Sequence, residues 1–211
     1  LLRSYRPGVG VVPGQHDIIE RWTHEQLDLL DTHFAQYAYL LGSKPCMGDF
    51  GLIGPLYAHL GRDPWPAREL IAKRPNLHAW VKRMMKPTQP GAGKFIANDV
   101  IPDTLLPLFK SVFGEFWPQL ELTVGEMERT RANLKPGRGW SRMLGMIDVP
   151  MANATLRVGA RPFSLWMAQR SLDTFHALPA ADQASVQDWL NSIDAGDALK
   201  LAIPRLRQVA L

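Results

Sequence analysis

The amino-acid sequence predicts an all-α protein, with a helical bundle over residues 18–86 and a helical extension after residue 95 that has room for one small β-hairpin. Two observations support this prediction. Apolar residues recur at steps of three and four along most of the chain, which is the spacing of one helix face. The chain has 211 residues, 46% hydrophobic and 21% charged, and so it can bury a substantial core.

The first helix is expected over residues 18–41. Its apolar stripe comprises Ile18, Trp22, Leu27, Leu30, Phe34, Tyr37, Ala38 and Leu41. Acidic residues occupy other faces, so this helix is amphipathic, and Gly42 is a typical residue just after a helix end. Residues 1–6 resemble the tail of a helix without its beginning, and we therefore expect further residues upstream of Leu1.

Two more helices complete the predicted bundle. One follows Cys46 and closes at Gly61, and its glycines at 48, 51 and 54 suit a face on which a neighbouring helix packs closely. A short helical segment at residues 69–73 then leads to a helix after Pro75. The apolar stripe of this last helix comprises Leu77, Trp80, Val81 and Met84.

A stretch rich in proline and glycine at residues 87–93 is the one plausible boundary, which divides the chain into domains of residues 1–86 and 87–211. Beyond it, helices are expected over residues 102–116, 120–134, 163–176, 181–193 and 198–206. Residues 146–151 and 155–158 suit a hairpin that turns at Asn153, with Pro150 restricting the first strand to an edge.

Composition excludes several classes of protein. A single cysteine cannot form an internal disulfide, and no secretion signal opens the sequence, so we expect a cytoplasmic protein. No apolar run approaches the roughly 20 residues that span a bilayer, so no membrane partner is expected. The histidines lack the spacing of metal ligands. Basic residues cluster at Arg129, Arg131, Lys135, Arg138 and Arg142, and without a motif that reads nucleic acid they favour a solvated face over nucleic-acid binding.

Cys46 and Asp49 form the sharpest local pattern. A carboxylate three residues inside a helix can accept the N-cap backbone N–H and complement the positive helix end, so this pair reads as a capping box with Cys in the Ser or Thr position. A helix N-terminus would also lower the pKa of the Cys46 thiol, which is the environment of reactive cysteines.

Two phrases of this region resemble the helical C-terminal domain of glutathione S-transferases. Residues 39–50 read YLLGSKPCMGDF and residues 74–84 read RPNLHAWVKRM, in the family's order and at its spacing. Cys46 stands where the family has Ser or Thr, and Gly48 where it usually has Ala. Residues 87–211 resemble, more weakly, a long extension of some bacterial transferase-like proteins, through residues 101–107 and 162–167.

The resemblance implies a protein that conjugates glutathione to small hydrophobic electrophiles, and it implies a homodimer. In the family, glutathione is bound and activated mainly by a preceding thioredoxin-like domain, whose pattern is absent from this sequence. No catalytic residue can therefore be assigned here. Within this chain the resemblance offers Tyr5 and Arg6 as substrate contacts, for which a loop at the chain end is the alternative interpretation. It also implies a structural role for Cys46 and Asp49.

Two other functions stay open from the sequence. Helical domains of this family also occur as non-catalytic modules for protein interaction, which predicts an exposed apolar patch and no response to glutathione. Nucleic-acid binding through the cluster from Arg129 to Arg142 predicts an affinity that falls steeply with salt. The sequence names neither the electrophile nor the residue that would activate the thiol.

Overall fold

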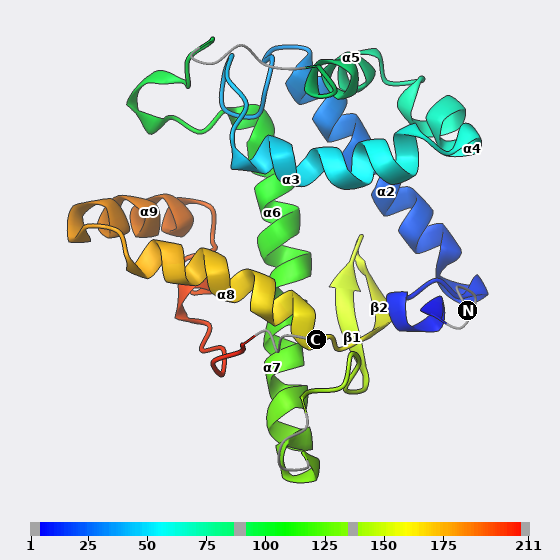
Figure 1. The fold of residues 1–211 in the computed structure, drawn as a ribbon, viewed down its shortest axis with the longest axis vertical. Helices are drawn as coiled ribbons and strands as arrows, with labels where there is room; N and C mark the ends of the chain where they lie inside the picture. The colour runs from blue at the N-terminus through cyan, green and yellow to red at the C-terminus, as the bar shows by residue number, and fades with distance from the viewer. Residues whose placement is uncertain (1–4, 87–91, 135–138, 208–211) are drawn as a thin grey trace. The chain divides into compact units, whose positions relative to one another are not determined.

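The computed structural model describes residues 5–86, 92–134 and 139–207 (Figure 1). The expectations for residues 1–4, for residues 87–91 and for Lys135 and Arg138 lie outside this range. The chain divides into two compact units. One comprises Glu20–Phe109, and the other comprises the residues up to Ile19 together with those from Lys110 onward.

The Glu20–Phe109 unit consists of helices joined by short connections. Its elements are α2 (His16–Phe34, which starts in the other unit), α3 (Met47–Pro55), the π-helical turn η3 (Leu56–Gly61), α4 (Pro64–Pro66), the π-helical turn η4 (Ala67–Ile71), α5 (Pro75–Met84), the 3-10 turns η5 (Ala97–Asp99) and η6 (Asp103–Leu105), and the start of α6 (Leu106–Ser111). A core of apolar side chains joins them. Trp80 of α5 is fully buried at its centre and stacks on Phe34 of α2, with ring centroids 4.7 Å apart.

Two polar contacts tie α2 to α5. The Asp31 carboxylate accepts the backbone N–H groups of Asn76 and Leu77 at 2.8 and 2.9 Å, so a side chain of α2 caps the N-terminus of α5. Arg74, just before α5, is buried and donates to the Asp28 carboxylate at 2.7 Å and to the backbone oxygen of Leu70 at 2.9 Å. The apolar stripe of the predicted third helix therefore packs as expected, and a carboxylate of α2 accepts the free backbone N–H groups at the start of that helix.

The second unit contains a hairpin and helices. Its elements are the 3-10 turns η1 (Pro7–Val9) and η2 (Pro13–Gln15), the π-helical turn η7 (Val112–Phe116), α7 (Trp117–Thr130), the 3-10 turn η8 (Arg131–Asn133), β1 (Met146–Met151), β2 (Ala154–Gly159), α8 (Pro162–His176), α9 (Ala180–Ser192) and the 3-10 turn η9 (Ala198–Lys200). Figure 1 shows α8 crossing α7, and Leu165 of α8 is buried with Leu120 and Met127 of α7.

The predicted hairpin is confirmed. β1 and β2 pair antiparallel, with Met151 opposite Ala154, and Ala152 and Asn153 form a two-residue turn with φ of 49° and 58°. Left-handed backbone at both turn residues matches the right-handed twist of the strands. One face of the hairpin is buried through Ile147, Val149, Leu156 and Val158.

The expected all-α architecture is confirmed, but some expected boundaries are wrong. The helix predicted over residues 18–41 ends at Phe34. Tyr39 and Gly42 instead exchange backbone hydrogen bonds, and Ile96 donates to the Leu41 carbonyl at 3.0 Å. These tertiary pairings outweigh the helical spacing of the apolar residues after Phe34.

Two further segments differ from prediction. Residues 102–134 were expected as two helices separated at Trp117 and Pro118, whereas helical backbone continues from Leu106 to Asn133. Pro118 lies at the start of α7, directly after the π-helical turn η7, so the proline stands at a change of hydrogen-bond pattern and not inside a regular α-helix. The helix expected over residues 198–206 is only the short turn η9.

The division by compactness differs from the boundary expected after residue 86, because residues 92–109 belong to the helical unit and the chain's beginning belongs to the other unit. A family-based boundary between 1–86 and 87–211 stays a prediction. Among the described residues, no helix is both long enough and apolar enough to cross a membrane.

Candidate functional site

The Asp49 carboxylate is the polar centre of the helical unit. It is fully buried, and it accepts three N–H donors: the Cys46 backbone at 2.9 Å, the Leu40 backbone at 3.2 Å and the Trp80 indole at 2.9 Å. The Asp49 backbone N–H in turn points to the Cys46 side chain, which completes the capping box. This carboxylate therefore joins the start of α3 to α5 and to the loop before α3.

The Cys46 thiol does not have the environment of a reactive cysteine. Burial is the main reason that its pKa is raised, and the hydrogen bond and negative charge of Asp49 act in the same direction. Backbone N–H groups at the start of α3 favour the thiolate, but their effect is smaller. The expectation of a lowered pKa was therefore wrong, because burial and the neighbouring carboxylate outweigh the helix N-terminus.

His33 of α2 is a second buried polar group of this unit. Its Nδ1 lies 2.7 Å from the Thr104 hydroxyl, and its Nε2 lies 3.4 Å from the Tyr39 carbonyl. Since a carbonyl only accepts, we assign the ring proton to Nε2 and the hydroxyl proton to the Nδ1 contact. Burial lowers the pKa of His33, although the Tyr39 carbonyl and the Asp49 charge act in the opposite direction. The imidazole is thus held neutral as a structural link.

The other unit contains a pocket of about 610 Å³, which is within the usual size range of small-molecule sites. The pocket is formed by three chain segments, at residues 5–9, 140–143 and 161–163. Most of its wall is apolar or aromatic, from Tyr5, Val9, Trp140, Met143, Pro162 and Phe163. Several of these side chains are unusually exposed for their type, Phe163 at 67% and Tyr5 at 54%. The chain therefore presents an open apolar hollow.

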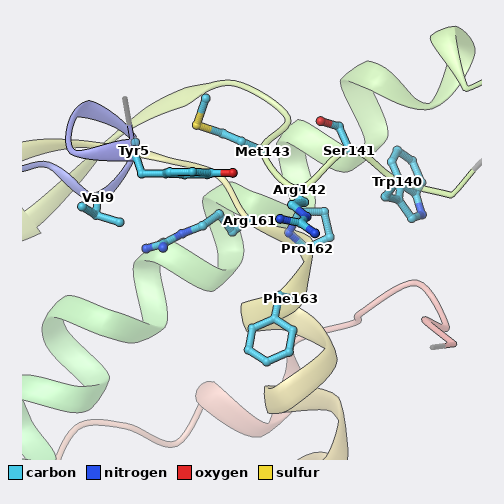
Figure 2. A pocket seen from close by; sticks show the side chains of 10 residues that line it. Tyr5, Val9, Trp140, Ser141, Arg142, Met143, Arg161, Pro162 and Phe163 are labelled. Carbon is cyan, nitrogen blue, oxygen red and sulfur yellow. The ribbon is translucent and has the colours of Figure 1, made fainter. Parts of the chain in front are cut away.

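Two arginines also line this pocket. In Figure 2, Arg161 extends on the side of Tyr5 and Val9, whereas Arg142 lies beside Pro162, closer to Trp140. Arg161 is the N-cap residue of α8, and Pro162 occupies the first position of that helix. The favourable use of Pro at this position explains why the chain turns into a helix directly at the pocket wall.

The structure places the residues predicted from the sequence in different surroundings. Tyr5 lines the pocket, whereas Arg6 is not among the lining residues. Sequence reasoning missed Arg161 and Phe163, although Pro162 at a helix start was a usable signal. It also assigned Arg142 to a solvated basic cluster. Arg129 of that cluster pairs with Glu126 at 2.6 Å and is not among the residues that line the pocket.

No group of metal-ligating side chains was found among the described residues. Among the described residues that line the pocket, Ser141 offers a hydroxyl, but no histidine or carboxylate is present to act as its general base. The chemistry that the pocket can support is therefore binding and orientation of a small molecule, with any attacking group supplied from elsewhere.

A protein-family model matches part of the chain. Residues 23–83 match the family model described as "Glutathione S-transferase, C-terminal domain". Searches of curated proteins and of solved structures found no match. The matched segment runs from α2 to α5 and includes Asp49, Trp80 and both cross-helix contacts of α2. Residues 23–83 of this chain are therefore a glutathione S-transferase C-terminal domain.

Proposed function

We propose that this chain acts in a glutathione transferase-like protein that conjugates glutathione to small hydrophobic electrophiles. In this reaction the glutathione thiolate attacks an electrophilic carbon, a carbon–sulfur bond forms, and the electron pair leaves with a departing group or moves into the electrophile. Glutathione would be held and activated mainly by a thioredoxin-like domain outside residues 1–211. This chain would hold the electrophile in position.

The family match over residues 23–83 carries the proposal, and the pocket adds support. A volume of about 610 Å³ with an apolar and aromatic wall suits a compound of one or two rings. Tyr5 is proposed as a contact of the electrophile, because its ring forms part of that wall. Arg6 is proposed for the same role only through its position next to Tyr5.

The test uses the protein as its source cell produces it, with its intact mass measured first. Conjugation of glutathione to an aryl chloride activated by two nitro groups is followed through the absorbance of the thioether product. We expect a rate above the uncatalysed reaction, and a several-fold higher KM for the aryl chloride in Tyr5→Ala with a smaller change in kcat. The matched control is Tyr57→Ala, which alters a tyrosine outside this pocket. Absence of a protein-dependent rate would exclude the proposal.

A second function, a non-catalytic module for protein interaction, has its own supporting observation. Met47, Phe50, Gly51 and Gly54 recur at the spacing of one face of α3, and Met47 and Phe50 are 85% and 59% exposed. The packed neighbour expected at these glycines is found only at Gly48, where an added Cβ would lie 2.8 Å from Leu40. At Gly51 and Gly54 such a Cβ meets nothing within 4 Å in the described part of the chain.

This open face is also where we place the proposed homodimer contact. The molecular mass in solution, measured by light scattering for wild type and for Phe50→Glu, tests whether the chain dimerises through this face. A wild-type dimer that dissociates in the variant supports the contact, and a monomeric wild type rejects it. If the protein also shows neither glutathione-dependent conjugation nor a rise in melting temperature with glutathione, the interaction module replaces the transferase as the better proposal.

A further inference from the structure

The pocket in the unit that contains α8 has a charge pattern that its apolar wall does not require. Among the described residues that line it, Arg142 and Arg161 are charged and none is acidic. Neither side chain forms an ion pair or hydrogen bond within the described residues. In contrast, Arg74, Arg129, Arg157 and Arg205 each pair with a carboxylate. These four arginines have carboxylate partners that Arg142 and Arg161 lack within the described residues.

Arg161 shows this most clearly. Its Nε is buried away from solvent and has no acceptor in the described structure. A buried donor without a partner costs roughly 1–3 kcal/mol, and more when it belongs to a charged group. Such a group requires an explanation. An anion seated in the pocket would bring acceptor oxygens to the other donors of this guanidinium, whose planar arrangement suits a carboxylate or sulfonate.

The start of α8 adds a third positive contribution. Arg161 is its N-cap residue, the helix runs for 15 residues to His176, and Phe163 in its first turn lines the pocket. The backbone N–H groups of a first turn lack partners within the helix, and the helix dipole places partial positive charge there. Anionic groups are favoured at such a position.

We propose that this pocket binds a small organic anion, with its aromatic or aliphatic body against Tyr5, Met143 and Phe163 and its acidic group at the arginines that line the pocket, Arg142 and Arg161. The inference rests on the proposed function in one respect, since it names the class of electrophile as one that carries an acidic group. Binding itself requires no catalysis. The described residues that line the pocket, at 5–9, 140–143 and 161–163, all lie outside the segment matched to the transferase family.

The experiment compares two fluorescent probes that share one apolar body. 8-Anilinonaphthalene-1-sulfonate carries a sulfonate, and N-phenyl-1-naphthylamine lacks it. Both are titrated into the purified protein without glutathione. We expect the sulfonate to bind at least tenfold more tightly than the neutral probe. Arg142→Gln and Arg161→Gln are each expected to weaken sulfonate binding about tenfold while changing binding of the neutral probe less than twofold.

Arg157→Gln is the matched control, because it removes the same charge from the same unit at an exposed ion pair with Asp148. Phe163→Ala tests the location, since it removes part of the apolar wall and is expected to weaken both probes. Equal binding of the two probes would overturn the inference. So would an effect of Arg157→Gln as large as that of Arg161→Gln, because attraction would then follow net charge only.

Near-UV circular dichroism of each variant verifies the folded state before titration. A variant that unfolds is replaced by Arg→Lys at the same position, which keeps the charge but loses the planar fork and is expected to weaken the sulfonate several-fold. Unchanged sulfonate binding in both Lys variants would count against the proposed contacts. Failure of glutathione conjugation with intact, arginine-dependent sulfonate binding would reject the proposed function and leave this inference standing.

Discussion

Replacing Asp49 is expected to damage the helical unit more than any exposed charge change. The carboxylate accepts three N–H groups, from Leu40, Cys46 and Trp80, and it has no access to solvent. A hydrogen bond to a charged group contributes about 1.5–3 kcal/mol, and three of them would give about 4–9 kcal/mol if they were additive. Because bonds that share one acceptor are not additive, we expect Asp49→Ala to lower the free energy of unfolding by about 4 kcal/mol.

Asp49→Asn keeps an acceptor oxygen but loses the charge, so we expect a loss of about 2 kcal/mol. The assay is urea unfolding followed by far-UV circular dichroism and tryptophan fluorescence, with coincidence of the two curves as the check on two-state behaviour. Asp63→Asn is the control, because Asp63 is exposed and makes no capping hydrogen bond, so a change within about 0.5 kcal/mol is expected. A loss below about 1 kcal/mol for Asp49→Ala would refute the reasoning.

Three further predictions concern separate groups. Burial depresses the pKa of His33. The neutral imidazole therefore contributes to the free energy of unfolding above the ordinary pKa of 6.5, and this contribution is lost as pH falls through the folded-state pKa. The free energy of unfolding is therefore expected to decrease on acidification below pH 6.5, and to depend less on pH in His33→Gln. Identical pH curves for wild type and His33→Gln would contradict this. Because burial raises the pKa of Cys46, a disulfide reagent at neutral pH is expected to modify it more slowly than a free cysteine; equally fast labelling would contradict the assignment. Ala152 has a φ of 49°, so Ala152→Gly is expected to stabilise the hairpin unit by about 1 kcal/mol in urea unfolding, and a destabilised variant would contradict the cost assigned to left-handed backbone at Ala152.

Much of the helical unit was predictable because its information is local. The stripe at Leu77, Trp80 and Val81 predicts a helix that packs on one side, and Cys46 with Asp49 predicts where α3 begins. The hairpin followed from alternating residues around Asn153. Each of these signals lies within a few residues of the chain, where propensity and capping decide the structure.

The errors and omissions share a different cause. The end of α2 at Phe34 depends on pairing between the loop at Gly42 and the chain at Phe95, which no local pattern encodes. The pocket likewise assembles Tyr5, Arg142 and Arg161 from three distant segments. Tyr5 was identified only through the family resemblance. No neighbouring sequence pattern distinguishes Arg142 and Arg161 from ordinary surface charges.

The cap that Asp31 provides for α5 also constrains the order of events during synthesis. Asp31 and its donor at Asn76 are 45 residues apart in the chain. A nascent chain that has released α2 from the ribosome still lacks the backbone N–H groups that this carboxylate accepts. The first long helix must therefore wait, with its apolar stripe uncovered, until α5 emerges, and this interval is when the unit depends most on protection from aggregation.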